Sequence, residues 1–214
     1  LKAAYEESGK FVMHLQQGVV PYERFVRGIG LGPQVHCVNY DPSAPLHDRY
    51  TQDWDFLDAE DRSVVRDVTL TINSFFGWDF NSAEMLLSEG VWHPIDFANP
   101  CPDSQVTSLH LHFPWLIKAK IRWSLFCAAT KRAFRQNLDW QPFWDVAAED
   151  LPDRDKLRRY AQIAERRFEK DRFDAFCDEH LAALDEVTWD YFGSDRAKDA
   201  VRAKVEAMFP RHEH

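Results

Sequence analysis

The spacing of apolar residues changes near residue 100, and this change constrains the fold more than any other feature of the sequence. Before it, Arg24 to Ile29 and Gln34 to Tyr40 alternate apolar and polar side chains, with Gly and Pro between them. Beyond Ser104, apolar residues recur with helical spacing almost to Pro210. The sequence therefore predicts the α+β class: an antiparallel sheet with packed helices, followed by an α-helical extension.

The individual elements are predicted from periodicity together with turn and cap residues. Strands are expected over residues 11–16, 24–29 and 34–40, with a later hairpin whose apolar runs begin at Glu84 and Val91 and flank Ser88 to Gly90. Helices are expected over residues 1–9, 61–76 with Asp61 as the N-cap, 113–134, 153–173, 173–191 and 195–209. We expect two parts: residues 1–128 with the sheet, and residues 129–214 as the helical extension.

Composition excludes several classes of protein. The 214 residues are 45% hydrophobic and carry a formal net charge of −9, which favours a packed core and disfavours general nucleic-acid binding. No run of about 18 apolar residues is present, so no membrane span is expected. The four cysteines form no C-x-x-C pair, which is typical of reduced thiols in a cytoplasmic protein. Because the first residue is Leu1, we expect a processed chain or a piece of a longer protein.

Two carboxylates flank the expected hairpin turn symmetrically. Glu84 lies six residues before Gly90, and Asp96 lies six residues after it. A tight turn centred near Gly90 would place the two acids opposite each other, with Cβ atoms about 4.5–5.5 Å apart. Such carboxylates repel each other, and a divalent cation between them would reverse the sign of the interaction. Asn99 adds a neutral oxygen, which completes an all-oxygen set suited to Mg²⁺ or Mn²⁺.

This segment resembles the C-terminal half of the ATP-grasp domain of carboxylate–amine ligases. That family has an acid on one strand, a Gly-containing hairpin, a second acid, an Asn and a Pro, which match Glu84, Gly90, Asp96, Asn99 and Pro102. The family spacing is acid-x-Asn, whereas this chain has two residues between Asp96 and Asn99, and a β-bulge would absorb the additional one. The resemblance implies that Glu84, Asp96 and Asn99 hold Mg²⁺ ions that bridge the phosphates of ATP.

The order of the upstream segments resembles the same family. Gln16 and Gln17 end a segment that resembles the hinge strand, whose backbone contacts adenine. Arg27 lies on a segment that resembles the next strand, where an Arg points at the nucleotide or the substrate. Arg49 is a further candidate for a phosphate or carboxylate contact, because a guanidinium matches both anions. The resemblance covers about residues 1–105, roughly half of the chain.

The resemblance implies an ATP-dependent ligase. A carboxylate would be activated as an acyl phosphate and then attacked by an amine or a similar nucleophile, on small-molecule or peptide substrates. Mg²⁺ would neutralise charge on the transferred phosphate, and Arg27 would stabilise that phosphate or the substrate carboxylate. The lysines and the glycine-rich loop of the family would precede Leu1, so we expect this chain to be inactive alone.

Other interpretations remain open at this point. The chain could be a non-catalytic helical interaction module with a small β platform, in which the acids are surface residues. Separately, Arg27 could be a surface strand residue paired with Glu23 or Asp41. A metal-dependent phosphodiesterase or nuclease would need a lysine near the second acid, and Lys118 and Lys120 lie more than twenty residues beyond it. His110 and His112 would form a possible zinc pair if extended, but no third ligand accompanies them at motif spacing, which favours a packing role.

Overall fold

The computed structural model describes residues 6, 17–45, 48–134 and 137–208. Its centre is a four-stranded antiparallel sheet with the strand order β2-β1-β3-β4. The strands are β1 Arg24–Leu31, β2 Gln34–Asn39, β3 Phe80–Ser88 and β4 Val91–Pro100. The α+β prediction is confirmed in this form. The expected strand over residues 11–16 and nearly all of the helix over residues 1–9 lie outside the described residues.

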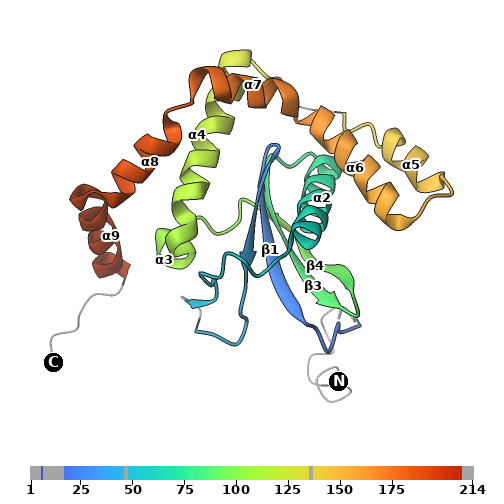
Figure 1. The fold of residues 1–214 in the computed structure, drawn as a ribbon, viewed down its shortest axis with the longest axis horizontal. Helices are drawn as coiled ribbons and strands as arrows, with labels where there is room; N and C mark the ends of the chain where they lie inside the picture. Colours follow the sequence, from blue (N-terminus) through green and yellow to red (C-terminus); the bar gives the residue numbers. More distant parts are fainter. Residues whose placement is uncertain (1–5, 7–16, 46–47, 135–136, 209–214) are drawn as a thin grey trace.

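Helices cover the sheet and continue beyond it. They are α2 Ala59–Phe76, α3 Val106–Leu109, the 3₁₀ turn η2 His110–His112, α4 Phe113–Thr130, α5 Gln141–Ala148, α6 Asp153–Arg167, α7 Lys170–His180, α8 Leu184–Gly193 and α9 Asp195–Met208. In Figure 1, α2 and α4 flank the sheet, α6 and α7 cross above it, and α8 and α9 descend beside α4. Among the described residues, no helix is both long and apolar enough to cross a membrane.

The start of α2 differs from the predicted one. Asp58 is the N-cap, and its carboxylate accepts a hydrogen bond from the Asp61 amide at 2.8 Å. Asp61 therefore lies inside the first turn, and its prediction as the cap is wrong. Asp58 and Asp61 are both acids near the positive end of the helix, so residue type does not distinguish them. The extended backbone of Asp58 and its bond from the Asp61 amide identify Asp58 as the cap.

The C-terminal helices break at positions that the periodicity does not show. The chain turns at Glu169, which adopts a left-handed φ of 54°, so α6 ends before the predicted residue 173. Phe168 and Phe173 lie on either side of this turn, and both are buried in the core. The predicted helix over 173–191 is likewise divided into α7 and α8, and α5 was not expected at all. These breaks let successive short helices bury their apolar sides.

The two faces of the sheet are packed differently. On one face, Gly28 and Gly30 let α2 approach closely, because an added Cβ would lie 2.2 Å from Thr69 Oγ1 or 2.3 Å from Asn73 Nδ2. The other face packs against α4, and the core cluster formed there continues into α6 and α7. Its buried members include Ile29, Leu31, Val38, Trp123, Phe126, Ala164, Phe168 and Phe173. The helical region therefore shares a core with the sheet, and the division at residue 128 stays a prediction.

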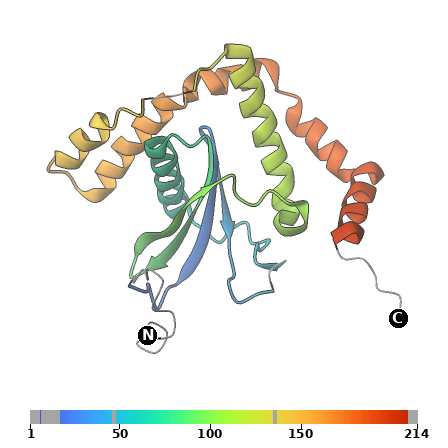
Figure 2. The ribbon, with the colours of Figure 1, turned by 180° about the vertical axis from the view of Figure 1, so that it is seen from behind.

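Figure 2 shows the sheet from behind, with the connection after β4 passing in front of it toward α3. Asp103, one of the acids near the hairpin, lies in this connection. Its carboxylate accepts hydrogen bonds from the Gln105 amide, at 2.9 Å, and from the Ser108 hydroxyl. The four cysteines carry free thiols, as expected.

Candidate metal centre

The hairpin between β3 and β4 closes through a two-residue turn. Ser88 pairs with Val91, and Glu89 and Gly90 between them have φ angles of 52° and 74°. Two successive left-handed residues are typical of a type I′ turn, which matches the twist of the flanking strands. The predicted tight turn near Gly90 is confirmed, and its centre lies between Glu89 and Gly90.

A β-bulge restores the pairing of the two acids. Met85 pairs with Pro94, yet the neighbouring Glu84 pairs with Asp96, so Ile95 is an additional residue on β4. In an uninterrupted register Glu84 would oppose Ile95, and Asp96 would point to the other face. The predicted opposition of Glu84 and Asp96 is confirmed, but a bulge produces it and not a symmetric turn.

A second bulge places the amide on the same face. Ser82 pairs with Asn99, so β4 advances three residues from Asp96 while β3 advances two from Glu84. Because alternate residues of a strand share a face, Asn99 lies on the face that carries both acids. The bulge expected from the spacing of Asp96 and Asn99 is present.

Asn81 holds this second bulge, and sequence reasoning did not single it out. Its side chain is fully buried, and its Nδ2 donates to the Phe97 carbonyl at 3.0 Å and to Asn73 Oδ1 at 2.8 Å. Its Oδ1 accepts from the Asn99 amide at 2.8 Å. The Asn81 side chain thus links the backbone at both ends of the bulge, Phe97 and Asn99, to Asn73 on α2. A polar residue at a buried strand position was the signal available in the sequence.

Arg27 is on β1 and lies beside the two acids. It pairs with Glu84 across the sheet, and its Nη1 is 3.8 Å from Glu84 Oε1. Its Nε donates to Ser82 Oγ at 3.0 Å, and its Nη1 also donates to the Tyr50 hydroxyl. The side chain is buried, so Arg27 is no surface residue of the sheet.

The electrostatics of the acids follow from these neighbours. The Glu84 side chain is only 17% exposed, and burial raises the pKa of its carboxyl; Asp96 raises this pKa further, while Arg27 lowers it. The expectation that only a divalent ion makes this pairing favourable is wrong in part, because Arg27 already compensates one of the two charges. One negative charge among the three groups remains for a cation to neutralise.

Arg49 lies on the same side of the molecule as Arg27. Its Nε donates to the Ala44 carbonyl at 3.2 Å and its Nη1 to the Tyr40 hydroxyl at 3.3 Å. The Tyr40 ring lies 5.4 Å from the Tyr50 ring, and Tyr50 contacts Arg27. Burial raises the pKa of Tyr50 to about 12, so its hydroxyl stays protonated beside the guanidinium. Two tyrosines thus connect the two arginines.

The remaining predicted residues are not placed in this centre. Gln16 lies outside the described residues, and Gln17 is exposed and belongs to no strand. Their contact with adenine stays a prediction. His110 and His112 lie in the turn η2 and not in an extended segment; the imidazole of His112 is buried against His36.

The oxygen donors Glu84, Asp96 and Asn99 fit a hard divalent cation, because they share one face and comprise two carboxylates and one amide. Within the described ranges, no group of three or more His, Cys, Asp or Glu side chains is arranged to hold a metal ion, and this set holds two such residues. Comparisons with models of protein families, with curated proteins and with solved structures found no match to this chain. The function is therefore argued from the geometry of the centre.

Proposed function

We propose that Glu84, Asp96 and Asn99 hold Mg²⁺ for bound ATP, in the C-terminal part of an ATP-grasp nucleotide site. The observation that carries this proposal is the doubly bulged pairing of β3 with β4, which brings three oxygen donors onto one face. Two bulges within six residues of β4 shift its register. Bulges of this kind are over-represented next to active sites, where they re-aim side chains.

In this proposal Arg27 is first a positioning residue. Its guanidinium is fixed by Ser82 and Tyr50, and it favours the ionised form of Glu84, which is the form that binds a cation. The residual negative charge of Glu84 and Asp96 then attracts the cation. A direct contact of Arg27 or Arg49 with phosphate or with a substrate carboxylate is a further part of the proposal.

The proposed reaction class is that of carboxylate–amine ligases. The bound Mg²⁺ would neutralise charge on the phosphates of ATP, so that a carboxylate can be phosphorylated and the acyl phosphate attacked by an amine. The residues of this chain would orient the cation and the nucleotide, with the backbone at Gln16 and Gln17 next to adenine. The substrates would be a small-molecule or peptide carboxylate and an amine.

The test is to replace the two acids by their amides, Glu84→Gln and Asp96→Asn, in the full-length protein. We expect both variants to bind Mn²⁺-ATP at least about tenfold more weakly, since each loses one charged ligand. Binding of Mn²⁺ is measured by electron paramagnetic resonance, and circular dichroism confirms that each variant is folded. Glu89→Gln, at the exposed hairpin turn, is the matched control and should bind normally.

A non-catalytic interaction module is the second candidate. The observation in its favour is on α8, where Val187, Trp189 and Tyr191 are 58%, 65% and 44% exposed. Under this alternative the wild type would show no Mn²⁺-ATP binding above background, and the amide variants would change nothing. That result would remove the acids from any nucleotide mechanism.

A further inference from the structure

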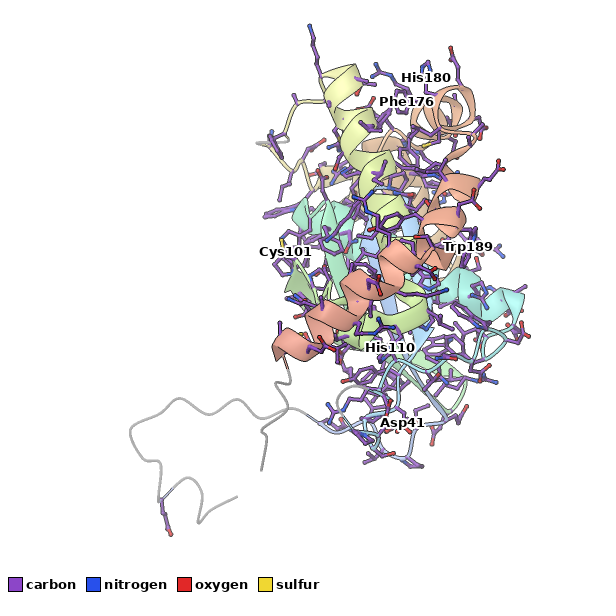
Figure 3. The ribbon with its side chains drawn as sticks, turned by 90° about the vertical axis from the view of Figure 1, so that its left-hand side faces the viewer. Asp41, Cys101, His110, Phe176, His180 and Trp189 are labelled. Carbon is purple, nitrogen blue, oxygen red and sulfur yellow. The ribbon has the colours of Figure 1, made fainter. Side chains whose placement is uncertain are left out.

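A pocket of about 180 Å³ lies on the α4 side of the molecule, apart from the paired acids of β3 and β4. It is lined by side chains from β2, from the loop before α2, and from α4 and α8, among them His36, Trp54, Trp115 and Trp189. Figure 3 looks onto this side and labels Trp189 on α8. An engineered apolar cavity of about 150 Å³ binds benzene, so this pocket has room for a small ring system.

Aromatic rings form a continuous wall of the pocket. The His36 ring stacks on Trp115 with centroids 4.8 Å apart, and it lies 6.3 Å from the Trp54 ring. Trp54 and Trp189 are 47% and 65% exposed, which leaves large indole surfaces open to water beside the pocket. A planar ring placed against these indoles would bury apolar surface and stack on aromatic faces. The lining therefore favours an aromatic ligand over an aliphatic one.

Hydrogen bonds orient the imidazoles of this wall, and burial favours their neutral form. His112 Nε2 lies 2.8 Å from the Thr51 carbonyl oxygen, which can only accept, so His112 carries its proton there. In the neutral form that burial favours by lowering the pKa of His112, its Nδ1 accepts from His36 Nε2, at 2.9 Å. Burial, with smaller contributions from His112 and nearby cations, lowers the pKa of His36 to about 3. His36 thus contributes a flat aromatic surface without charge.

Lys118 and Asp185 line the pocket, and Arg122, which lies outside the lining, adds a positive excess beside them. Lys118 Nζ lies 2.5 Å from Asp185 Oδ1, and Arg122 Nη2 lies 3.6 Å from the same oxygen. Two cations share a single carboxylate, so the group has a net charge of +1. Lys118 lines the pocket and its side chain is only 20% exposed, which reduces the screening of its charge. This charge favours an anionic ligand.

We propose that this pocket binds a small planar aromatic carboxylate. The ring would lie against Trp54, Trp115 and Trp189, and the carboxylate would meet the ammonium group of Lys118. This site does not depend on the proposed nucleotide site, because it shares no residue with Glu84, Asp96 or Asn99.

Indole-3-acetate is a suitable probe, with titration of the full chain by calorimetry. Indole-3-acetamide keeps the ring and removes the charge, and cyclohexylacetate keeps the charge and removes the aromatic ring. We expect each of the two analogues to bind at least about fivefold more weakly than indole-3-acetate. Equal binding of the amide would overturn the assignment of an anion, and equal binding of cyclohexylacetate would overturn the assignment of an aromatic ring.

Variants locate the site. Trp189→Ala and Lys118→Met should each weaken binding of indole-3-acetate by about tenfold, because they remove a stacking surface and the counter-charge respectively. Trp144→Ala is the matched control, since Trp144 is 55% exposed on α5 and does not line the pocket. Circular dichroism confirms that each variant is folded. Absence of binding to the wild type, or binding unchanged in both pocket variants, would overturn the proposal.

Discussion

Replacing Arg27 by methionine should destabilise the protein through the charge that it leaves behind on Glu84. The guanidinium Nη1 lies 3.8 Å from Glu84 Oε1, and both side chains are largely buried. At an effective dielectric constant of about 20, two unit charges at this distance attract each other by about 4 kcal/mol before desolvation is counted. Because Glu84 keeps some exposure and desolvation opposes this attraction, we expect R27M to lower the free energy of unfolding by about 2–4 kcal/mol.

A double-mutant cycle separates this charge effect from lost packing. In the E84Q background there is no carboxylate to compensate, so R27M should cost about 1–3 kcal/mol less than it does in the wild type. The free energy of unfolding is measured at pH 7 from urea titrations followed by circular dichroism, with the slope compared between variants.

An exposed ion pair provides the control for this cycle. Lys198 Nζ lies 3.1 Å from Asp195 Oδ1 on α9, closer than Arg27 lies to Glu84, but both side chains are well exposed. The cycle K198M/D195N should show a coupling near zero, because solvent screens exposed pairs. If the effects of R27M and E84Q add within about 0.5 kcal/mol, Arg27 is not the counter-charge of Glu84, and our account of the centre is wrong.

Three further predictions concern the scaffold. Gly30→Ala should lower the free energy of unfolding by about 1–3 kcal/mol in urea titrations, because the added Cβ would lie 2.3 Å from Asn73 Nδ2. Gly193→Ala is the control and should leave the free energy of unfolding unchanged, because no atom lies within 4 Å of the Cβ it adds on α8. Asn81→Ala should cost about 1–3 kcal/mol and also weaken Mn²⁺-ATP binding, since the second bulge loses its buried hydrogen bonds; normal binding would contradict this role. With the pKa of His36 lowered to about 3, the unfolded chain binds a proton below pH 6.5 that the folded protein does not bind. Stability should therefore fall as the pH is lowered from 6.5 toward 3, by up to about 1.4 kcal/mol per pH unit from this residue. The slope should become shallower in H36Q, and an equal slope would refute the assignment.

The candidate metal centre shows which features of a site local sequence patterns can predict. The proximity of Glu84 and Asp96 was predictable, because both acids lie near one Gly-containing turn. Their direct opposition depends on the bulge at Ile95, which was not predictable, since a shift in register depends on contacts across the sheet. The second bulge could be expected from the spacing of Asp96 and Asn99, but the buried Asn81 side chain that holds it was not identified.

The four described strands and the helices α2 and α4 were predicted by the sequence alone, because periodicity and turn residues act over a few residues, whereas α5 and the breaks between the C-terminal helices were not predicted. Only the tertiary structure decided which distant groups meet. Arg27 is 57 positions from Glu84, and His36 is 76 positions from His112, yet each pair is in contact. These meetings set the charge of the acid centre and the aromatic wall of the pocket, and they depend on the pairing of β1 with β3 and on the contact of η2 with β2.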